Sequence, residues 1–398
     1  MSPGALHLKM KTILLARQVL TPLELIRDGA VVIEDATIAA VCRIAQLPEV
    51  RRATVLDFGD AILTPGLIDL HVHGGAGHDF MHADEAGLAA IEQHMARHGV
   101  TSYCATTITA PLEATLQSLE RLGKACKAKA EGNHNRARSR SLGIHLEGPF
   151  LSHARRGVHP AEHLQPPSTE LLNQLCEAAG GYVRMLTIAP ELAGASELIA
   201  EANRRGICAA MGHSDATLDE AQAGIRAGAR HATHMFNAMR ALHHRDPGIV
   251  GAVLADNLVT ADVIADGIHV HPVMLELLVR TKGAGRVVLI TDATSATGMP
   301  GGTYNLGDMQ VEVRGGRCEI NGILAGSVLT LDRAVRNMST FVNVSFQSAI
   351  CMATLNPARV LGLAGRKGVL RKGADADFTV FSTAGEVIQT IIGGRMIR

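Results

Sequence analysis

The sequence predicts a (β/α)₈ TIM-type barrel with a small β-sandwich domain built from both ends of the chain. After Pro65, short apolar segments alternate with helical segments for about 260 residues, and eight strands alternating with helices are typical of such a barrel. Short β-rich runs precede this region and return near the C-terminus. The length of 398 residues suits one barrel with an appended smaller domain.

Three stretches of the chain make up this architecture. Residues 1–62 form the N-terminal part of the small β domain, and within them residues 11–60 contain short β-rich runs broken by charged turns, which indicate an antiparallel sheet. Residues 63–365 form the barrel, with strands expected at 67–72, 102–108, 142–147, 183–189, 207–212, 230–234, 260–265 and 286–291. Helices are expected at 84–98, 111–128, 168–179, 194–205, 215–227 and 272–282. We expect residues 366–398 to pair, through strands at 376–381 and 387–392, with the N-terminal strands.

One predicted helix also shows its end signals. Asp215 stands at the start of the 215–227 segment as a candidate N-cap, and Gly228 follows as a terminator.

The composition excludes several kinds of partner. Lys plus Arg and Asp plus Glu number 38 each, so no overall field attracts nucleic acid or an anionic membrane, and an anionic substrate would need local positive groups. The seven cysteines are scattered and form no CxxC pair, which is typical of a reduced chain. The N-terminus lacks the apolar core of a signal peptide, and no apolar run could span a membrane. We therefore expect a cytoplasmic protein.

Metal-binding residue types stand at the ends of five predicted strands. Because side chains alternate along a strand, the two histidines of the HxH motif face the same way. The carboxyl ends of barrel strands converge on one mouth, where imidazole and carboxylate together suit zinc or another first-row divalent ion. A lone histidine at a strand end is more often structural, but six such groups in barrel order favour a metal site. They are His71, His73, Glu147, His213, His234 and Asp292.

Neighbouring residues refine this prediction. Gly148 and Pro149 form a rigid turn that would hold the preceding Glu147 carboxylate at a bend. Asp69 shares a face with the HxH histidines, and we expect it to support them. His231 lies three residues before His234 and is expected to be structural.

The motifs that contain these residues resemble those of the amidohydrolase superfamily, and within it the N-acetylglucosamine-6-phosphate deacetylases. They include PGLIDLHVHG (65–74), GIHLEGPFL (143–151), MGHSDAT (211–217), THMFNAM (233–239), RDPGIVG (245–251) and LITDATSATG (289–298), and they extend over nearly the whole chain. The fourth strand ends in LTIAPE (186–191), without the lysine that bridges two metals in many hydrolases with this barrel. That absence disfavours cyclic-amide hydrolases and deaminases.

The resemblance implies a divalent metal, zinc before iron or another first-row ion, in one or two sites per chain. It implies that Glu147, His213 and His234 hold the principal metal and that His71 and His73 form a second site, with Glu147 as the bridge. It implies acid–base catalysis by Asp292 and polarisation of the substrate carbonyl by His159. The implied substrate contacts are His269 with the sugar, backbone N–H groups of Asn237 and Ala238 with phosphate, and Arg245 with phosphate across a homodimer interface.

The implied reaction is hydrolysis of the N-acetyl amide of N-acetylglucosamine 6-phosphate, an amino sugar phosphate, to glucosamine 6-phosphate and acetate. The same reaction on N-acetylgalactosamine 6-phosphate differs by the orientation of one hydroxyl and stays open. A non-catalytic amidohydrolase-like scaffold is an alternative of another class. Such relatives usually lose ligands, whereas this chain has kept every candidate.

Overall fold

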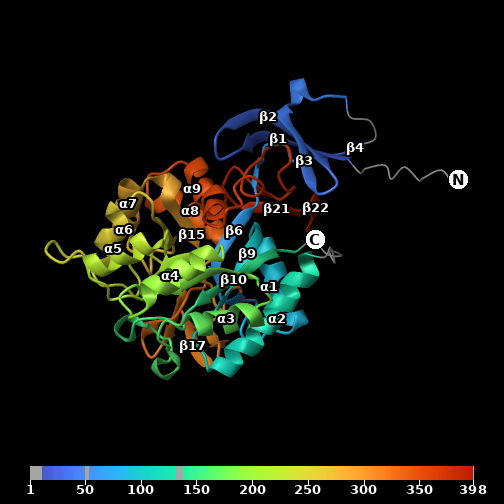
Figure 1. Cartoon of the computed structure of the whole chain (residues 1–398). Coiled ribbons are helices and arrows are strands. Elements are labelled where there is room, and N and C mark those ends of the chain that lie inside the picture. The colour runs from blue at the N-terminus through green and yellow to red at the C-terminus, as the bar shows by residue number, and fades with distance from the viewer. Residues whose placement is uncertain (1–10, 50–52, 131–137, 398) are drawn as a thin grey trace.

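A barrel of parallel strands and a β domain drawn from both chain ends make up the structure, a computed structural model that describes residues 11–49, 53–130 and 138–397 (Figure 1). Both parts of the predicted fold class are confirmed. The division of the chain at residues 62 and 365 stays a prediction.

Eight strands form the barrel sheet and follow one another in chain order, each parallel to the next. The sheet closes through a parallel bridge between Val72 and Ala293 and a 2.9 Å hydrogen bond from the Asp292 N–H to the His71 carbonyl. The strands are β6 (Leu67–Val72), β9 (Val100–Thr107), β10 (Arg140–Glu147), β11 (Val183–Ile188), β12 (Cys208–Met211), β13 (His231–Ala232), β14 (Thr260–Ile264) and β15 (Val287–Ile290).

Helices connect these strands and cover the outside of the barrel (Figure 1). They are α1 (Glu85–Arg97), α2 (Leu112–Ala130), α3 (Thr169–Ala178), α4 (Ala195–Arg204), α5 (Leu218–Ala227), α6 (Gly248–Ala255), α7 (Pro272–Lys282), α8 (Leu331–Phe341), α9 (Phe346–Ala353) and α10 (Leu355–Val360). The six predicted helices are confirmed within three residues at each end.

The predicted N-cap of α5 is wrong. Thr217 caps the helix instead, because its hydroxyl accepts the N–H of Glu220 while the Glu220 side chain accepts the Thr217 N–H. Gly228 ends the helix in a left-handed conformation, as predicted. Asp215 therefore lies two residues before the cap.

The small domain is one sheet of eight strands, and its two halves join where β20 pairs antiparallel with β5. The predicted antiparallel pairing holds for β1, β2 and β3. It is wrong for β4, which returns to the free edge of β1 and runs parallel to it, as does β5 beyond the predicted stretch. The strands are β1 (Lys11–Leu20), β2 (Leu25–Glu34), β3 (Thr37–Arg43), β4 (Ala53–Asp57), β5 (Ile62–Pro65), β20 (Phe378–Phe381), β21 (Val387–Ile392) and β22 (Arg395–Met396).

A further antiparallel sheet, absent from the sequence-based prediction, lies between β15 and α8. Its apolar face packs on Met81 and Ile108 beside the barrel mouth, and Asp79 Oδ2 accepts the Gly307 N–H at 2.7 Å. The four strands are β16 (Gly302–Leu306), β17 (Met309–Arg314), β18 (Arg317–Ile320) and β19 (Ile323–Leu324), and a small hairpin of β7 (Gly74–Gly75) and β8 (His78–Asp79) follows the HxH motif.

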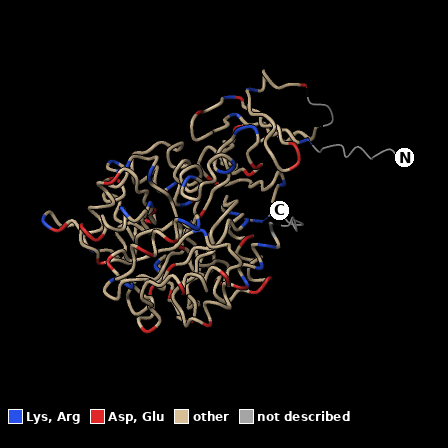
Figure 2. Tube along the Cα trace, viewed as in Figure 1, with Lys and Arg blue, Asp and Glu red and all other residues tan. Residues whose placement is uncertain are grey.

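Charges of both signs are interspersed along the whole trace (Figure 2), in keeping with the equal numbers of acids and bases. None of the helices in the described ranges is both long enough and apolar enough to cross a membrane. The N-terminal segment on which the signal-peptide expectation rests lies almost entirely outside the described residues.

Candidate metal centre

The six predicted metal or acid–base side chains lie together, buried at the carboxyl ends of the barrel strands. They form two groups in which all ligand atoms lie within 4.8 Å of one another. One group is His71, His73 and Asp292, and the other is Glu147, His213 and His234.

Glu147 stands between the two groups. Its Oε1 lies 3.3 Å from His71 Nε2, 3.2 Å from His213 Nε2 and 3.1 Å from His234 Nε2. Its Oε2 lies 3.3 Å from His73 Nε2. One carboxylate thus reaches the nitrogen atoms of both groups, which is the placement that a bridging ligand requires.

The backbone turns sharply at three of these residues. His213, His234 and Asp292 have positive φ angles of 46°, 31° and 50°. Non-glycine residues seldom adopt this left-handed conformation, and it persists at functional sites where the surrounding structure holds it. The turn directs each side chain from its strand end across the barrel mouth.

The spacing of the nitrogens fits a metal. His213 Nε2 and His234 Nε2 are 3.0 Å apart, and His71 Nε2 and His73 Nε2 are 3.2 Å apart. Two nitrogens bound to one tetrahedral zinc at 2.0–2.1 Å lie about 3.3–3.4 Å apart. These buried imidazoles therefore face one another at nearly the separation that a shared cation gives.

The electrostatics of the site keep both of its carboxylates ionised. Burial alone would raise the pKa of Asp292, but His71 and a hydrogen bond from His73 lower it to about 2. Burial opposes ionisation of Glu147 too, yet the surrounding histidines hold its pKa well below the usual range. Burial lowers the pKa of His213 to about 4, so its imidazole is neutral, the state in which it binds a metal.

Two other histidines, His73 and His234, have raised pKa values, and the same two carboxylates are the cause. Burial tends to lower the pKa of His73, but its contacts with Asp292 and Glu147 raise it to about 10. Burial is likewise outweighed at His234, where Glu147 raises the pKa to about 9. Each of these imidazoles thus carries a positive charge beside a carboxylate, a charge that a bound metal ion would replace.

Residues behind the ligands hold them in place. His213 Nδ1 lies 3.0 Å from the Arg155 carbonyl, which fixes the imidazole plane. Asp69 accepts the Thr291 hydroxyl at 2.6 Å and the His71 N–H at 3.3 Å, and so ties the first strand to the residue before Asp292. This is the supporting position that the alternation predicts.

The structure also places His231 away from the converging nitrogens. Its Nε2 lies 2.9 Å from Asp262 Oδ2, and Asp262 Oδ1 accepts the N–H of His234. Asp262 therefore links His231 to the backbone of His234.

His159 faces the same mouth in a defined tautomer. The Thr109 N–H donates to His159 Nδ1 at 3.3 Å, and Thr109 Oγ1 lies 2.8 Å from the same nitrogen. Because a backbone N–H can only donate, Nδ1 must accept and the proton belongs on Nε2. That Nε2 lies 3.4 Å from Glu147 Oε2, so its N–H points toward the candidate metal ligands.

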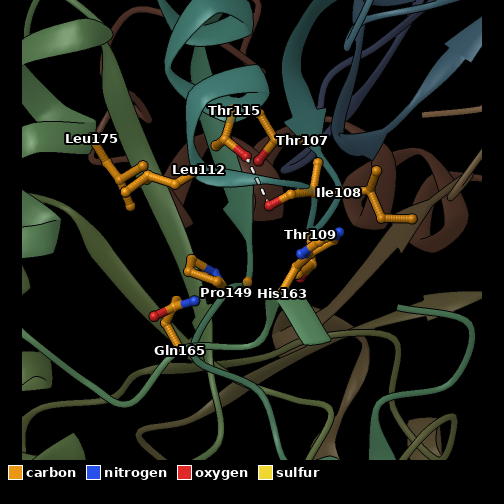
Figure 3. Close-up of a pocket in the computed structure, with 11 residues that line it drawn as sticks. Thr107, Ile108, Thr109, Leu112, Thr115, Pro149, His163, Gln165 and Leu175 are labelled. Atoms are coloured by element: carbon orange, nitrogen blue, oxygen red, sulfur yellow. Dashed lines mark hydrogen bonds between the residues drawn. The ribbon is translucent and has the colours of Figure 1, made fainter. Parts of the chain in front are cut away.

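A cavity lies next to Thr109, which is one of the residues that line it (Figure 3). The ends of β9 and β10 and the helices α2 and α3 line it, through residues that include Ile108, Leu112, Pro149 and Gln165. None of the metal-ligand candidates lines this cavity, so it is distinct from the reacting centre.

The predicted substrate contacts lie on three loops. The Asn237 N–H donates to the His234 carbonyl at 2.9 Å and is thus engaged, while Ala238 has a positive φ of 50°. Arg245 lies on an exposed loop, with its Nη1 2.8 Å from His244 Nε2, and is not brought to the metal ligands. Asp266 holds His269 Nδ1 at 2.7 Å, and His269 Nε2 is buried with no hydrogen-bond partner among the described residues.

Sequence reasoning missed Thr109 and Glu191. Thr109 follows the predicted strand 102–108, so its place at a strand end was a signal for it. Glu191 was noted only because the strand before it has no lysine. In the structure it accepts the Ser214 hydroxyl and the Asp215 N–H, both at 2.7 Å, and so fixes the turn after His213.

A parallel barrel with buried imidazole and carboxylate side chains gathered at its strand ends is typical of metal-dependent barrel enzymes. The model of the amidohydrolase family matches residues 62–397. The N-acetylglucosamine-6-phosphate deacetylase of Bos taurus is 40% identical over 353 residues, 86% of this chain and 84% of that protein. The protein of the same name from Bacillus subtilis (strain 168) is 38% identical over 95% of both chains. The chain belongs to the amidohydrolase family.

Two further relatives bear on the substrate. A solved N-acetyl-D-glucosamine-6-phosphate deacetylase from Mycobacterium smegmatis, a mutant in complex with N-acetyl-D-glucosamine-6-phosphate, superposes with a TM-score of 0.90 at 35% identity, over 98% of this chain and 100% of that one. The N-acetylgalactosamine-6-phosphate deacetylase of Escherichia coli O157:H7 is 37% identical over 97% of this chain and 99% of that protein.

Proposed function

We propose that this chain hydrolyses the N-acetyl amide of N-acetylglucosamine 6-phosphate to glucosamine 6-phosphate and acetate. The observation that carries the proposal is the placement of Glu147 between two buried ligand groups, with the acid–base candidate Asp292 and the N–H donor His159 at the same mouth. The relatives that share this family support the choice of an amino sugar phosphate as substrate.

The donor set favours zinc, with iron or another first-row divalent ion as alternatives, in one or two sites per chain. Glu147, His213 and His234 would hold the principal ion, and His71 and His73 a second one that shares Glu147. When bound, the ion supplies a water of lowered pKa and an electrophile for the carbonyl oxygen.

The side chains divide the proton transfers between them. Asp292, ionised at neutral pH, accepts the proton of the attacking water and then delivers it to the nitrogen of the leaving amine. His159 donates its Nε2 proton as a hydrogen bond to the carbonyl oxygen, where negative charge develops in the transition state. Thr109 holds this imidazole in the donating tautomer.

The phosphate would bind at the turn of Asn237 and Ala238. The N–H of Ala238 is the donor there, because that of Asn237 is already engaged. His269 would contact the sugar through its unpaired Nε2. We also propose a cytoplasmic homodimer in which Arg245 reaches the phosphate of the neighbouring site, in keeping with its exposed loop.

The decisive experiment is release of acetate from N-acetylglucosamine 6-phosphate by the purified protein, with and without a chelator. We expect turnover that the chelator abolishes and that zinc or another divalent ion restores. Comparison with N-acetylgalactosamine 6-phosphate separates the two epimers. Failure to release acetate from either sugar in the metal-loaded protein would favour the scaffold alternative.

A further inference from the structure

Asp215 joins two arginines at the turn that follows β12. Its Oδ1 accepts Arg155 Nε at 2.7 Å, and its Oδ2 lies 3.6 Å from Arg240 Nη1. The same Nη1 donates to the Asp215 carbonyl at 3.2 Å. The Asp215 N–H donates to Glu191 Oε1 at 2.7 Å. An acid that does not cap the next helix is therefore fixed through both its side chain and its main chain.

The first arginine belongs to the loop that carries His159. The Arg155 carbonyl lies 3.0 Å from His213 Nδ1, and the N–H of Ser152 donates to the His213 carbonyl at 3.0 Å. Arg156 Nη1 donates to the His159 carbonyl at 2.7 Å. The loop is thus attached to the end of β12 on one side and holds His159 on the other.

The second arginine belongs to the segment that carries the turn of Asn237 and Ala238, the proposed phosphate site, which we call the phosphate turn. The N–H of Arg240 donates to the Ser214 carbonyl at 2.9 Å, and the N–H of Ser214 donates to the Ala238 carbonyl at 3.0 Å. Arg240 Nε also donates to Asp246 Oδ2 at 2.9 Å, next to Arg245. Asp215 consequently contacts both segments that would hold the two ends of the substrate.

We propose that Asp215 is a positioning residue that sets the distance between the phosphate turn and His159. The inference rests on the proposed function, in which the phosphate and the amide are opposite ends of one sugar. A misplacement of about 1 Å at the reacting centre can cost about 100-fold in rate. Stability does not explain the network, because its side chains are 30–39% exposed and such ion pairs contribute little to folding.

The test compares a phosphorylated with an unphosphorylated sugar. In Asp215→Ala we expect kcat for N-acetylglucosamine 6-phosphate to fall about 10-fold or more, with KM changed less than about threefold. Turnover of N-acetylglucosamine should change less than about threefold, because a sugar without an anchored phosphate can settle against His159 wherever it lies. Arg155→Ala should reproduce the defect, and the double variant should be no worse than either single variant.

Asp219→Ala is the matched control, because Asp219 is an exposed acid four positions along the chain. Asp215→Asn keeps an acceptor for Arg155 and should be intermediate, and it serves as the test protein if the alanine variant does not fold. Equal losses on both sugars, or loss of bound metal in either variant, would overturn the inference. An inactive wild-type protein would instead refute the proposed function.

Discussion

Asp292→Asn separates proton transfer from metal binding. Asp292 Oδ1 lies 3.1 Å from His73 Nε2 and 3.5 Å from His71 Nε2, and asparagine keeps an oxygen at this position. Asparagine also tolerates the left-handed backbone at this residue, where φ is 50°, better than alanine does. The substitution therefore removes the base while it leaves the shape of the turn.

The expected fall in kcat of Asp292→Asn follows from the proposed role of the carboxylate in proton transfer. General acid–base catalysis contributes about 10²–10⁴-fold, which is about 2.7–5.4 kcal/mol of transition-state stabilisation. Asp292 is proposed to act twice, on the water and on the leaving amine, so we expect the upper half of this range. Because Glu147, His213 and His234 are untouched, the principal metal should remain bound.

The assay combines kcat for acetate release with the metal content of the same preparation. Asp219→Asn provides a matched change of an exposed acid on α5 and should stay near wild-type activity. Activity of Asp292→Asn within 10-fold of wild type, with full metal content, would refute the assignment of Asp292 as the acid–base group.

Three further outcomes are expected. Thr109→Val removes the hydroxyl at His159 Nδ1 and keeps the backbone N–H, so kcat should fall about 5- to 30-fold with KM nearly unchanged; an unchanged kcat would show that the hydroxyl does not help to hold His159. Metal removal should lower the unfolding temperature, since an ion at 100 times its Kd adds about 2.7 kcal/mol; identical melting curves with and without a chelator would count against a metal bound by the folded state. Lys367→Met leaves the buried Asp377 without its ion-pair partner and leaves Asp375 with Arg366 alone, and it should cost about 3–5 kcal/mol in urea unfolding. Burial alone would raise the pKa of Asp375, but Lys367 and Arg366 lower it, so this stability is present above about pH 4 and is lost as the pH falls through the depressed value. In Lys367→Met the free energy of unfolding should therefore depend less on pH in this acid range. An unchanged pH dependence would refute the pairing of Lys367 with Asp375.

Much of the fold could be predicted because barrel strands and helices have recognisable patterns in the local sequence. Apolar runs such as 287–290 are buried on both faces, and their carboxyl ends meet at one edge whatever the loops do. The sheet of β16–β19 was missed, although residues 309–314 alternate in burial. Its strands follow one another without intervening helices, so a prediction based on the alternation of strands and helices does not include them.

The candidate site also contains residues that local sequence patterns could predict and residues that they could not. His71, His73, Glu147, His213 and Asp292 could be named in advance, because each stands at the end of a predicted strand. The error at Asp215 shows the limit of local rules, since it and Thr217 are both good capping residues. Asp215 lies instead against Arg155, a residue 60 positions away.

By itself the sequence determined the barrel, the ends of its strands and the chemical types gathered there, because periodicity and residue identity are local properties. Only the tertiary structure decided the distances at which Glu147 stands between the two groups, that Thr109 sets the tautomer of His159, and that Asp215 lies against Arg155 instead of capping α5. These facts depend on where separate loops and left-handed turns aim their side chains, and the contacts that fix them join residues far apart in the chain.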